Sequence, residues 1–403
     1  MEEIKKEIIE KVILVAVADQ DTTEAEESLD ELEELVKTAG AEVAARVIQV
    51  RETPHPGTYI GKGKIDEVNA LLYGTNATGI VCDDELSPAQ ISNLEEALDT
   101  KVMDRTLIIL DIFAKRAFTR EGKIQVELAQ LKYRASKLTG QGRALSRLGG
   151  GIGTRGPGEK KLEMDRRLIK SRIAQLNREL KDVKKHREVT REQRSRSHIP
   201  VAAIVGYTNA GKSTLLNTLT GAGILAEDKL FATLDPTTRD LKLPSGQEIL
   251  MTDTVGFIRK LPHHLIEAFR STLEEAKYAD IILHVVDASN PQMDEQMYTV
   301  YETLQNLGVK DKPVITVFNK IDRMEDPWVP RDLRADYHVK ISAKTGEGIT
   351  GFLQSIEAVL RERKVEIEAL YPYKEAGKIQ KIRKYGELQE EEYREDGIFV
   401  RAF

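Results

Sequence analysis

The chain has 403 residues, of which 40% are hydrophobic and 31% charged, and its formal net charge is −6. This is ordinary for a folded protein of two or three domains. A single cysteine excludes an intramolecular disulfide bond and fits a reducing, cytoplasmic environment, and the 7 scattered histidines show no zinc cluster. The start MEEIKKEIIEK has no apolar core, so we expect no signal peptide, and no stretch reaches the ~18–20 apolar residues of a membrane span.

The first hundred or so residues predict a small α/β domain. The acidic segment 23–39 predicts a helix, and another is expected from about Ser87, with Pro88 in its first turn. Three apolar runs predict strands: 12–18, 43–50 and 77–83. Alternating strands and helices favour a partly parallel sheet.

A loop rich in glycine and lysine, from His55 to Lys64, precedes a helix in this domain. It could bind a second nucleotide or RNA phosphates, or it could be a turn with two solvated lysines. Its glycines lack the spacing of a phosphate-binding loop.

The charges are strongly separated along the chain. Residues 1–113 hold 10 Lys and Arg against 25 Asp and Glu, residues 114–198 hold 24 against 9, and residues 199–403 hold 26 against 32. A basic block between two acidic regions favours a nucleic-acid partner, because neutralising phosphates supplies much of the affinity for such a partner. The alternative is a solvated helical face that pairs with its acidic neighbours.

The basic block predicts two helices, over residues 123–138 and 159–192. The second repeats apolar residues every seven positions, a pattern typical of helices that pair, so we expect an antiparallel hairpin. The loop 140–159 is rich in glycine and arginine and has little apolar material to bury. It would lie exposed at the hairpin tip and offer three arginines to RNA: Arg143, Arg147 and Arg155.

Residues 201–214, VAAIVGYTNAGKST, combine an apolar run, a glycine-rich turn and a helix start in the order of a phosphate-binding loop. The glycines let consecutive N–H groups and the helix N-terminus face phosphates. Lys212 can reach the β- and γ-phosphates, and the Ser213 hydroxyl is placed to bind Mg²⁺.

Four further segments follow at the spacing of a Ras-like guanine-nucleotide domain. The connection FATLDPTTR (231–239) offers hydroxyls to Mg²⁺; we choose Thr233, and Thr237 and Thr238 compete with it. After an apolar run, Asp253 can hold Mg²⁺ through water, and Gly256 can offer its N–H to the γ-phosphate.

The last two segments predict recognition of the guanine base. The strand 313–318 ends in Asn319, Lys320 and Asp322, and Asp322 can accept two hydrogen bonds that adenine cannot supply. Ser342, Ala343 and Lys344 follow on a loop that closes over the base. The five segments in this order indicate a GTP-binding domain.

The position after Gly256 holds Phe257, where Ras-like proteins often have a glutamine that orients the attacking water. We therefore expect slow intrinsic hydrolysis that a partner or a rearrangement must complete. Asn209 could help to hold a monovalent cation, such as K⁺, beside the phosphates; alternatively, it only caps the loop.

Taken together, these segments resemble the HflX family of translational GTPases over essentially the whole chain. The resemblance rests on seven segments: PGTYIGKGK (56–64), DDELSPAQ (83–90), DRTLIILDIFAKRA (104–117), GGGIGTRGPGEKKLE (149–163), GYTNAGKST (206–214), FATLDPTTR (231–239) and DTVGFI (253–258). It implies a ribosome-associated GTPase that binds the large ribosomal subunit and its rRNA, with the N-terminal region and the helical arm directed at RNA. It also implies a role in splitting or rescuing ribosomes under stress, and some members are reported to hydrolyse ATP.

The expected architecture is an N-terminal α/β domain (1–118), a basic helical hairpin (119–198), a Ras-like P-loop GTPase domain (199–364) and a small C-terminal α+β domain (365–403). We expect a free monomer that binds Mg²⁺ and GTP or GDP. The catalytic residues are expected to be Lys212, Thr233, Asp253 and Gly256, with Ser213 and Thr233 as metal ligands. The nucleotide is expected to contact Gly206, Tyr207, Thr208, Asn209, Ala210, Gly211, Lys212, Ser213, Thr214, Phe231, Ala232, Thr233, Leu234, Asp235, Asp253, Thr254, Val255, Gly256, Asn319, Lys320, Asp322, Ser342, Ala343 and Lys344.

These residues are compatible with three functions. The first is a GTP-dependent switch in which nucleotide-ordered loops change how the basic arm meets RNA. The second is an ATP-driven RNA-remodelling factor that works through the N-terminal glycine and lysine loop. The third is a scaffold that uses nucleotide only for stability. Splitting, anti-association and large-subunit assembly stay open, since all three need GTP-controlled RNA binding.

Overall fold

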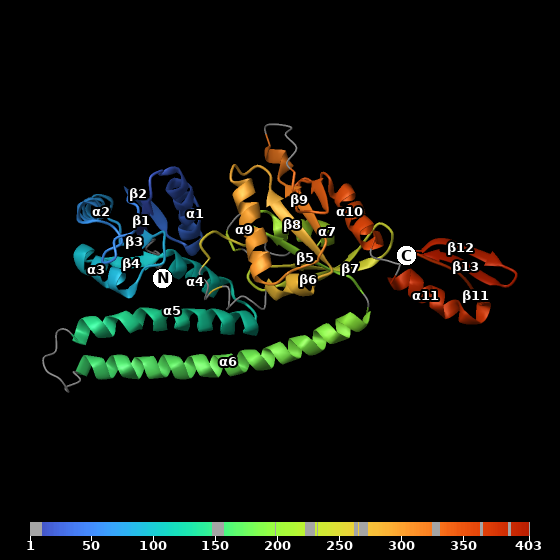
Figure 1. Cartoon of the computed structure of the whole chain (residues 1–403), viewed down its shortest axis with the longest axis horizontal. Helices are drawn as coiled ribbons and strands as arrows, with labels where there is room; N and C mark the ends of the chain where they lie inside the picture. The colour runs from blue at the N-terminus through green and yellow to red at the C-terminus, as the bar shows by residue number, and fades with distance from the viewer. Residues whose placement is uncertain are drawn as a thin grey trace, which may run out of the picture. The chain divides into compact units, whose positions relative to one another are not determined.

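The structure is a computed structural model of the chain. It describes residues 10–146, 157–197, 199–221, 230–231, 233–261, 265, 273–324, 331–362, 366–385 and 388–402. The chain divides into two compact units: Met1–Val183 with Lys260–Phe269, and Lys184–Arg259 with Arg270–Phe403. The α/β architecture expected from the sequence is confirmed, with a separate sheet in the N-terminal, middle and C-terminal parts of the chain (Figure 1).

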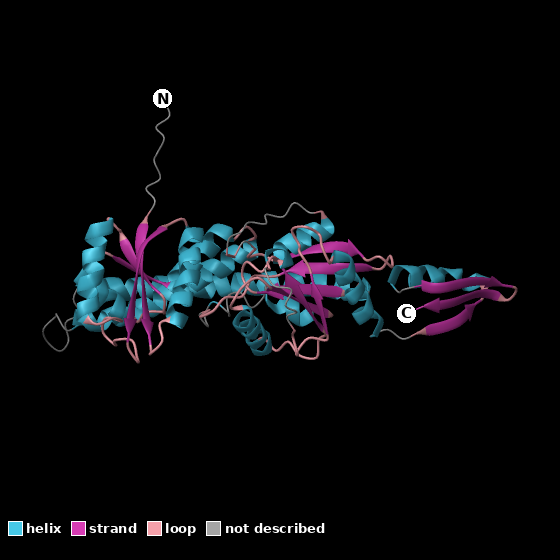
Figure 2. Cartoon of the chain, turned by 90° about the horizontal axis from the view of Figure 1, so that it is seen from above, coloured by secondary structure: helices cyan, strands magenta, loops and turns pink. Residues whose placement is uncertain are grey.

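The first unit contains a four-stranded parallel sheet in the order β2-β1-β3-β4. Its strands are β1 (Lys11–Ala18), β2 (Glu42–Val50), β3 (Gly79–Cys82) and β4 (Lys101–Asp104). Both faces carry helices, as Figure 2 shows: α1 (Thr23–Ala39), α2 (Lys62–Thr75), α3 (Pro88–Leu98) and α4 (Arg105–Arg116). The expected parallel pairing is confirmed, and β4 is an addition that sequence reasoning missed.

The helix predicted from Ser87 begins with a complete capping box. The Ser87 side chain accepts from the N–H of Gln90, the Gln90 side chain accepts from the N–H of Ser87, and Pro88 opens the helix. Both exchanges satisfy N–H groups that a helix start leaves without partners. The first turn of α3 is therefore fixed by local sequence.

The basic block forms two long helices, α5 (Arg120–Ser146) and α6 (Pro157–Ser197). Within the first unit they pack through an apolar seam, and Arg172 pairs with Glu127 at 2.7 Å. The residues of the seam are Ile124, Leu128, Leu131, Ile173, Leu176, Leu180 and Val183. Both helices extend beyond their predicted ends, so Arg143 lies in α5 rather than in a loop. Arg147 and Arg155 lie outside the described residues.

The second unit is built on a six-stranded sheet in the order β10-β9-β8-β5-β7-β6, in which only β6 is antiparallel to its neighbour. Its strands are β5 (Val201–Gly206), β6 (Thr237–Lys242), β7 (Glu248–Asp253), β8 (Ile281–Asp287), β9 (Val314–Asn319) and β10 (Tyr337–Lys340). The described helices around it are α7 (Lys212–Thr220), α9 (Met293–Asn306) and α10 (Ile349–Glu362), with a short 3₁₀ turn, η1 (Ile321–Arg323). The strands are apolar because helices cover both faces of the sheet. Their carboxyl ends meet at one edge, where ligands bind in sheets of this kind.

The C-terminal region is a small antiparallel sheet in the order β11-β13-β12. Its elements are β11 (Ile367–Tyr371), η2 (Tyr373–Glu375), α11 (Ala376–Tyr385), β12 (Leu388–Arg394) and β13 (Gly397–Ala402). Ile379 of α11 packs against Ile398, Val400 and Ala402, which form the core of this region.

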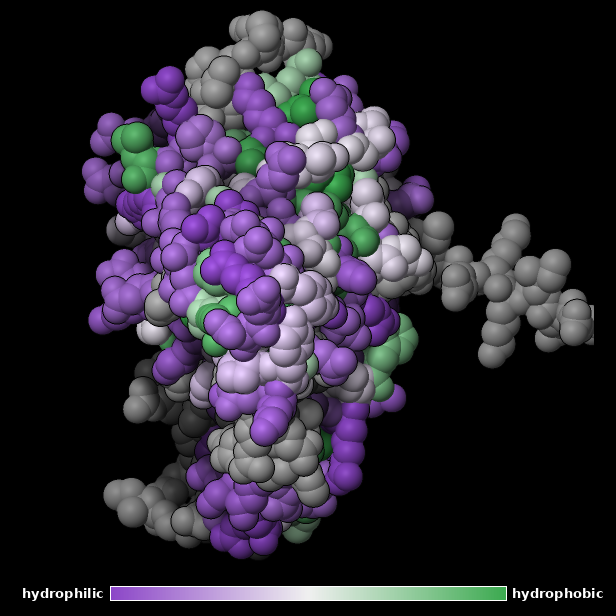
Figure 3. Space-filling model, turned by 90° about the vertical axis from the view of Figure 1, so that its right-hand side faces the viewer, coloured by the Kyte–Doolittle hydropathy of each residue, from purple (hydrophilic) through white to green (hydrophobic). Residues whose placement is uncertain are grey.

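The face drawn in Figure 3 is mainly hydrophilic, and its hydrophobic residues lie in small separate groups. Among the helices that the structure describes, none is long and apolar enough to cross a membrane.

Candidate active site

The phosphate-binding loop joins the end of β5 to the start of α7. Two glycines are required here by close contacts with neighbouring strands. A Cβ on Gly206 would lie 2.2 Å from the carbonyl oxygen of Val285, and one on Gly211 would lie 2.2 Å from Nδ2 of Asn319. Gly211 also has a φ of 96°, in the left-handed region that L residues rarely adopt. Larger residues at either position would displace the loop from the sheet.

Lys212, at the start of α7, is buried beneath this loop. Its ammonium group donates to the carbonyl of Tyr207 at 2.7 Å. Burial lowers the pKa of Lys212 to about 8, although the nearby carboxylate of Asp253 acts to raise it. A phosphate would add negative charge here and favour the protonated lysine.

Two hydroxyls and one carboxylate converge beside Lys212. The Ser213 hydroxyl donates to Oδ2 of Asp253 at 2.7 Å, the Thr233 hydroxyl does so at 3.0 Å, and the two hydroxyl oxygens lie 2.7 Å apart. The other carboxylate oxygen, Oδ1, is buried and accepts no hydrogen bond from the described residues. Burial raises the pKa of Asp253, and Lys212 opposes that rise. These hard oxygen donors, with one carboxylate oxygen that has no partner among the described residues, are suited to a magnesium ion.

The structure distinguishes the three threonines that the sequence left in competition. Thr233 lies against Asp253, whereas the Thr238 hydroxyl lies 3.0 Å from that of Thr252, on the neighbouring strand. Thr237 begins β6 and pairs in register with Asp253. Of the three hydroxyls, that of Thr233 makes a hydrogen bond to the carboxylate.

The segment after Asp253 runs beside the phosphate-binding loop. A Cβ on Gly256 would lie 2.8 Å from Cγ2 of Thr208 and 3.0 Å from Nζ of Lys212, so only glycine fits. Phe257 donates its N–H to Gly206 and accepts from Thr208, at 3.1 and 2.7 Å. Its ring is buried, so its side chain cannot hold a water molecule in place.

The expected base-binding residues lie at the ends of β9 and β10. Buried Asn319 donates to the carbonyl of Ala210 at 2.8 Å and accepts from the N–H of Ala343 at 2.9 Å, which joins the phosphate-binding loop to the 342–344 loop. The Ser342 hydroxyl donates to Asp322 at 2.7 Å and lowers the pKa of its carboxyl group. Lys320 pairs with Asp287 at 2.7 Å.

The structure changes one detail of the expected selectivity for guanine. Asp322 is exposed in the structure, so its carboxylate is a preset acceptor rather than a buried one. Discrimination by an unpaired buried carboxylate would therefore operate only once a base covers it.

The remaining expected contact residues have varied positions. Phe231, Leu234 and Val255 are buried, and the Thr254 hydroxyl donates to the carbonyl of Ile204 at 2.7 Å. Lys344 is exposed. Thr214, on α7, and Asp235 are half-buried, and Asn209 is exposed. Ala232 lies outside the described residues.

Sequence reasoning missed two polar contacts near the site. Asp287, at the end of β8, holds Lys320, and the Tyr207 hydroxyl accepts from the N–H of Arg259 at 2.8 Å. An Asp that ends an apolar run is a sequence signal that could have identified the first. The second depends on the positions of two segments 52 residues apart, and no local pattern indicates it.

Comparison with known proteins agrees with this geometry. Residues 26–114 match the family described as GTP-binding GTPase N-terminal, residues 116–194 match GTP-binding GTPase Middle Region, and residues 201–320 match 50S ribosome-binding GTPase. GTPase HflX of Lacrimispora saccharolytica is 71% identical, over 99% of this chain and 94% of its own length. The chain belongs to the HflX family of GTPases.

Further HflX relatives and one solved structure support this assignment. GTPase HflX of Escherichia coli is 45% identical over 82% of this chain and 78% of its own length. The crystal structure of SsGBP in complex with GDP has a TM-score of 0.50 and 26% identity, over 88% of this chain and all of that chain. The chain is therefore a P-loop GTPase that binds guanine nucleotide and hydrolyses GTP, in a ribosome-associated family.

Proposed function

We propose that this protein is a cytoplasmic, GTP-controlled switch that binds the large ribosomal subunit and acts in splitting or rescuing ribosomes under stress. The observation that carries the proposal is the combination, in one chain, of the nucleotide site with a helical hairpin whose residues 114–198 hold 24 Lys and Arg against 9 Asp and Glu. Such a basic element favours an RNA partner, since released counterions drive its binding.

The roles of individual residues follow from their contacts. Lys212 would hold the β- and γ-phosphates, and the N–H of Gly256 would reach the γ-phosphate, close to Lys212. Ser213, Thr233 and Asp253 would hold Mg²⁺, directly or through water. When bound, Mg²⁺ supplies charge neutralisation on the phosphates. The buried Oδ1 of Asp253 supports this assignment, because a buried acceptor without a partner is costly unless a ligand satisfies it.

Asp322 would recognise the guanine base, with its carboxylate held by the Ser342 hydroxyl. We expect Asp322→Ala to abolish guanine selectivity while the phosphate contacts remain. An ATP-driven remodelling factor that works through the loop from His55 to Lys64 would keep its activity in this variant. Competition of GTP and ATP for the variant separates the two functions.

As a second proposal, Asn209 helps to bind a monovalent cation. It is exposed, has a left-handed φ of 60°, and its side chain makes no hydrogen bond to a described residue, which does not favour a capping role. Its amide oxygen could help to hold K⁺ beside the phosphates, where an arginine finger would otherwise place positive charge. We expect hydrolysis to fall when K⁺ is replaced by Na⁺; equal rates, with and without large subunits, would contradict this role.

The proposed function is tested by the rate of GTP hydrolysis at fixed K⁺ and Mg²⁺, with and without purified large ribosomal subunits. Because Phe257 is buried and cannot orient water, we expect a slow intrinsic rate and strong stimulation by the subunit. Purified small subunits are the control. Tight GTP binding without stimulated turnover would favour the scaffold instead.

The role of the helical hairpin in binding the large subunit is tested separately. Replacing Arg143, Arg147 and Arg155 by Gln should weaken binding to the large subunit at least about tenfold, with GTP affinity unchanged, because fewer phosphates are neutralised. Replacing three lysines of the GTPase domain is the matched control for net charge: Lys242, Lys310 and Lys312. Equal binding by the two variants would show that charge at the hairpin tip does not determine the interaction.

A further inference from the structure

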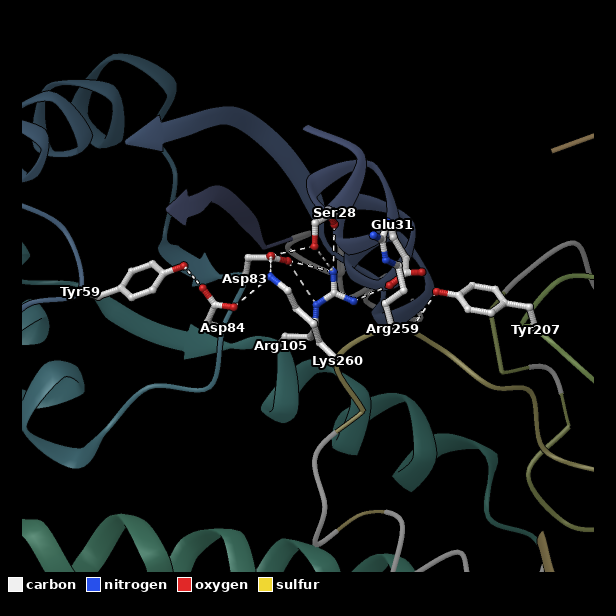
Figure 4. Close-up of polar contacts among 9 residues, drawn as sticks. All are labelled: Ser28, Glu31, Tyr59, Asp83, Asp84, Arg105, Tyr207, Arg259 and Lys260. Atoms are coloured by element: carbon white, nitrogen blue, oxygen red, sulfur yellow. Dashed lines mark hydrogen bonds and ion pairs between the residues drawn. The ribbon is translucent and has the colours of Figure 1, made fainter. Parts of the chain in front are cut away.

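A group of charged residues in the first unit, which we call the Asp83 cluster, includes a lysine from the segment that follows the nucleotide site (Figure 4). Its members are Ser28, Glu31, Asp83, Asp84, Arg105 and Lys260. Asp83 and Arg105 are each 1% exposed, and the guanidinium group donates to Oδ1 of Asp83 at 2.8 and 3.2 Å. Oδ2 of Asp83 accepts from the Ser28 hydroxyl at 2.8 Å and from the ammonium group of Lys260.

Lys260 also pairs with Asp84 at 2.9 Å, and the buried Tyr59 hydroxyl donates to the other oxygen of Asp84 at 2.7 Å. Arg105 pairs with Glu31 at 2.5 Å. Without Lys260, the cluster would place three carboxylates beside one guanidinium group. Lys260 is thus the second cation, and it offsets part of the excess negative charge of the cluster.

The residues just before Lys260 are bound to the phosphate-binding loop, inside the second unit. Hydrogen bonds join Phe257 to Gly206 and Thr208, and the N–H of Arg259 donates to the Tyr207 hydroxyl at 2.8 Å. The division between the units falls between Arg259 and Lys260. Consecutive residues are therefore fixed by two different sets of contacts, one set in each unit.

The backbone at this junction has an uncommon conformation. Lys260 has a φ of 53°, in the left-handed region that residues other than glycine rarely adopt. Such a conformation persists where surrounding contacts enforce it, and it is frequent at switch regions. On one side of this residue the N–H of Arg259 donates to the Tyr207 hydroxyl, and the Lys260 side chain itself makes the ion pairs with Asp83 and Asp84.

We infer that Lys260 is a positioning residue that couples the nucleotide state to the first unit, through its ion pairs with Asp83 and Asp84. The inference rests on the proposed function in one respect: the γ-phosphate contact is assigned to Gly256, four residues before Lys260. When the segment from Gly256 to Arg259 moves with the γ-phosphate, the attached lysine is drawn away from the carboxylates or returned to them. The buried Asp83 carboxylate thereby gains or loses its second cation, the 42% exposed Lys260.

The inference is tested first by zero-length carbodiimide cross-linking of the full-length protein, which joins a lysine amine to a carboxylate only when the two are in contact. Peptides that join Lys260 to Asp84 are quantified by mass spectrometry in GDP and in a non-hydrolysable GTP analogue. We expect the yields to differ at least fivefold. Equal yields in the two states, or no 260–84 peptide in either, would overturn the inference.

The second test uses variants at Lys260. Lys260→Met should leave nucleotide affinity within about twofold of the wild type. It should reduce the stimulation of hydrolysis by large ribosomal subunits at least tenfold. Lys260→Arg, which keeps the positive charge, should retain that stimulation. Lys242→Met, on β6, is the matched control. Asp84→Asn, at a residue 36% exposed, serves if Lys260→Met fails to fold, and should show a smaller loss because Asp83 still holds the lysine. Normal stimulation of a folded variant would contradict the inference.

The two tests separate this inference from the proposed function. If the wild type is not stimulated by large subunits, the proposed function fails, and the cross-linking result alone decides the role of Lys260. If the wild type is stimulated and the cross-link is insensitive to nucleotide, the function stands and the coupling role of Lys260 is wrong.

Discussion

The parallel sheet of the first unit and the mainly parallel sheet of the second each place a buried aspartate at the carboxyl end of a strand. The two aspartates have opposite surroundings. Asp83 follows β3, and both of its oxygens accept from described residues. Asp253 ends β7, and one of its oxygens accepts from none of them. Since an unpaired buried acceptor is costly, the first arrangement is that of a stabilising group and the second is that of a site awaiting a ligand.

The pKa shifts of the two carboxyl groups express the same difference. Burial acts to raise both pKa values, but Arg105 and Lys260 outweigh it at Asp83 and lower the pKa there. At Asp253 burial dominates, and the pKa is raised in spite of Lys212. The protein thus stabilises one negative charge within itself and leaves the other to be stabilised by what binds.

The largest effect should come from breaking the satisfied cluster. Asp83→Asn removes the charge that balances buried Arg105, so we expect the first unit to lose about 3–5 kcal/mol of unfolding free energy. Hydrogen exchange of the amides of Ile80 and Val81, on β3, measures the loss in that unit. Unchanged protection of these amides would show that the buried pair is not stabilising.

Asp253→Asn should have the opposite effects: a large loss of activity and little loss of stability. We expect the rate of GTP hydrolysis to fall about 100-fold, because the carboxylate that would hold Mg²⁺ is lost. Stability without nucleotide should change by less than about 1 kcal/mol, since removing a charge that burial disfavours offsets the lost hydrogen bonds. Hydrolysis assays and denaturant unfolding of the nucleotide-free protein measure the two quantities. A large loss of stability would show that Asp253, like Asp83, stabilises the fold in the absence of a ligand.

The threonines give a matched pair within the second unit. Thr233→Ala should reduce hydrolysis by about 10-fold or more, because a hydroxyl beside Asp253 is lost. Thr238→Ala removes a hydroxyl that contacts only the neighbouring strand in the described residues, so the rate should stay within about twofold. Similar losses in both variants would mean that Thr233 has no separate role.

The smallest effect is a pH dependence of nucleotide affinity. Burial lowers the pKa of Lys212 to about 8 in the nucleotide-free protein, and phosphates raise it again on binding. Below pH 8 the lysine is already charged; above pH 8 binding must take up a proton, so affinity should fall about tenfold by pH 9. Calorimetry in two buffers of different ionisation enthalpy measures the proton uptake between pH 7 and 9. No uptake at pH 9 would contradict the lowered pKa.

Local patterns indicate the candidate nucleotide site because its expected residues are close in sequence or end apolar strands. The capping box at Ser87 depends on contacts within a few residues, and the turn from Gly206 to Lys212 is indicated by its own spacing of glycine and lysine. The same reasoning placed residues 140–146 in a loop, since glycines disfavour helix, yet α5 continues to Ser146.

Other features depended on contacts that no sequence pattern encodes. Lys260 and Asp83 are 177 positions apart, and the sequence shows each only as one charged residue among many. The strand KVMD (101–104) is too short for its period to indicate a strand. Tertiary contacts decide both, which is why sequence patterns indicate the candidate nucleotide site but not the Asp83 cluster.

Helix α6 has a mechanical consequence. It crosses from the first unit to the second between Val183 and Lys184 as one continuous helix of 41 residues, roughly 60 Å long at 1.5 Å per residue. From residue 159 to 199 the sequence has no glycine and no proline, the residues at which helices usually kink. Along these residues the helix therefore lacks the positions at which its backbone hydrogen bonds are most easily interrupted.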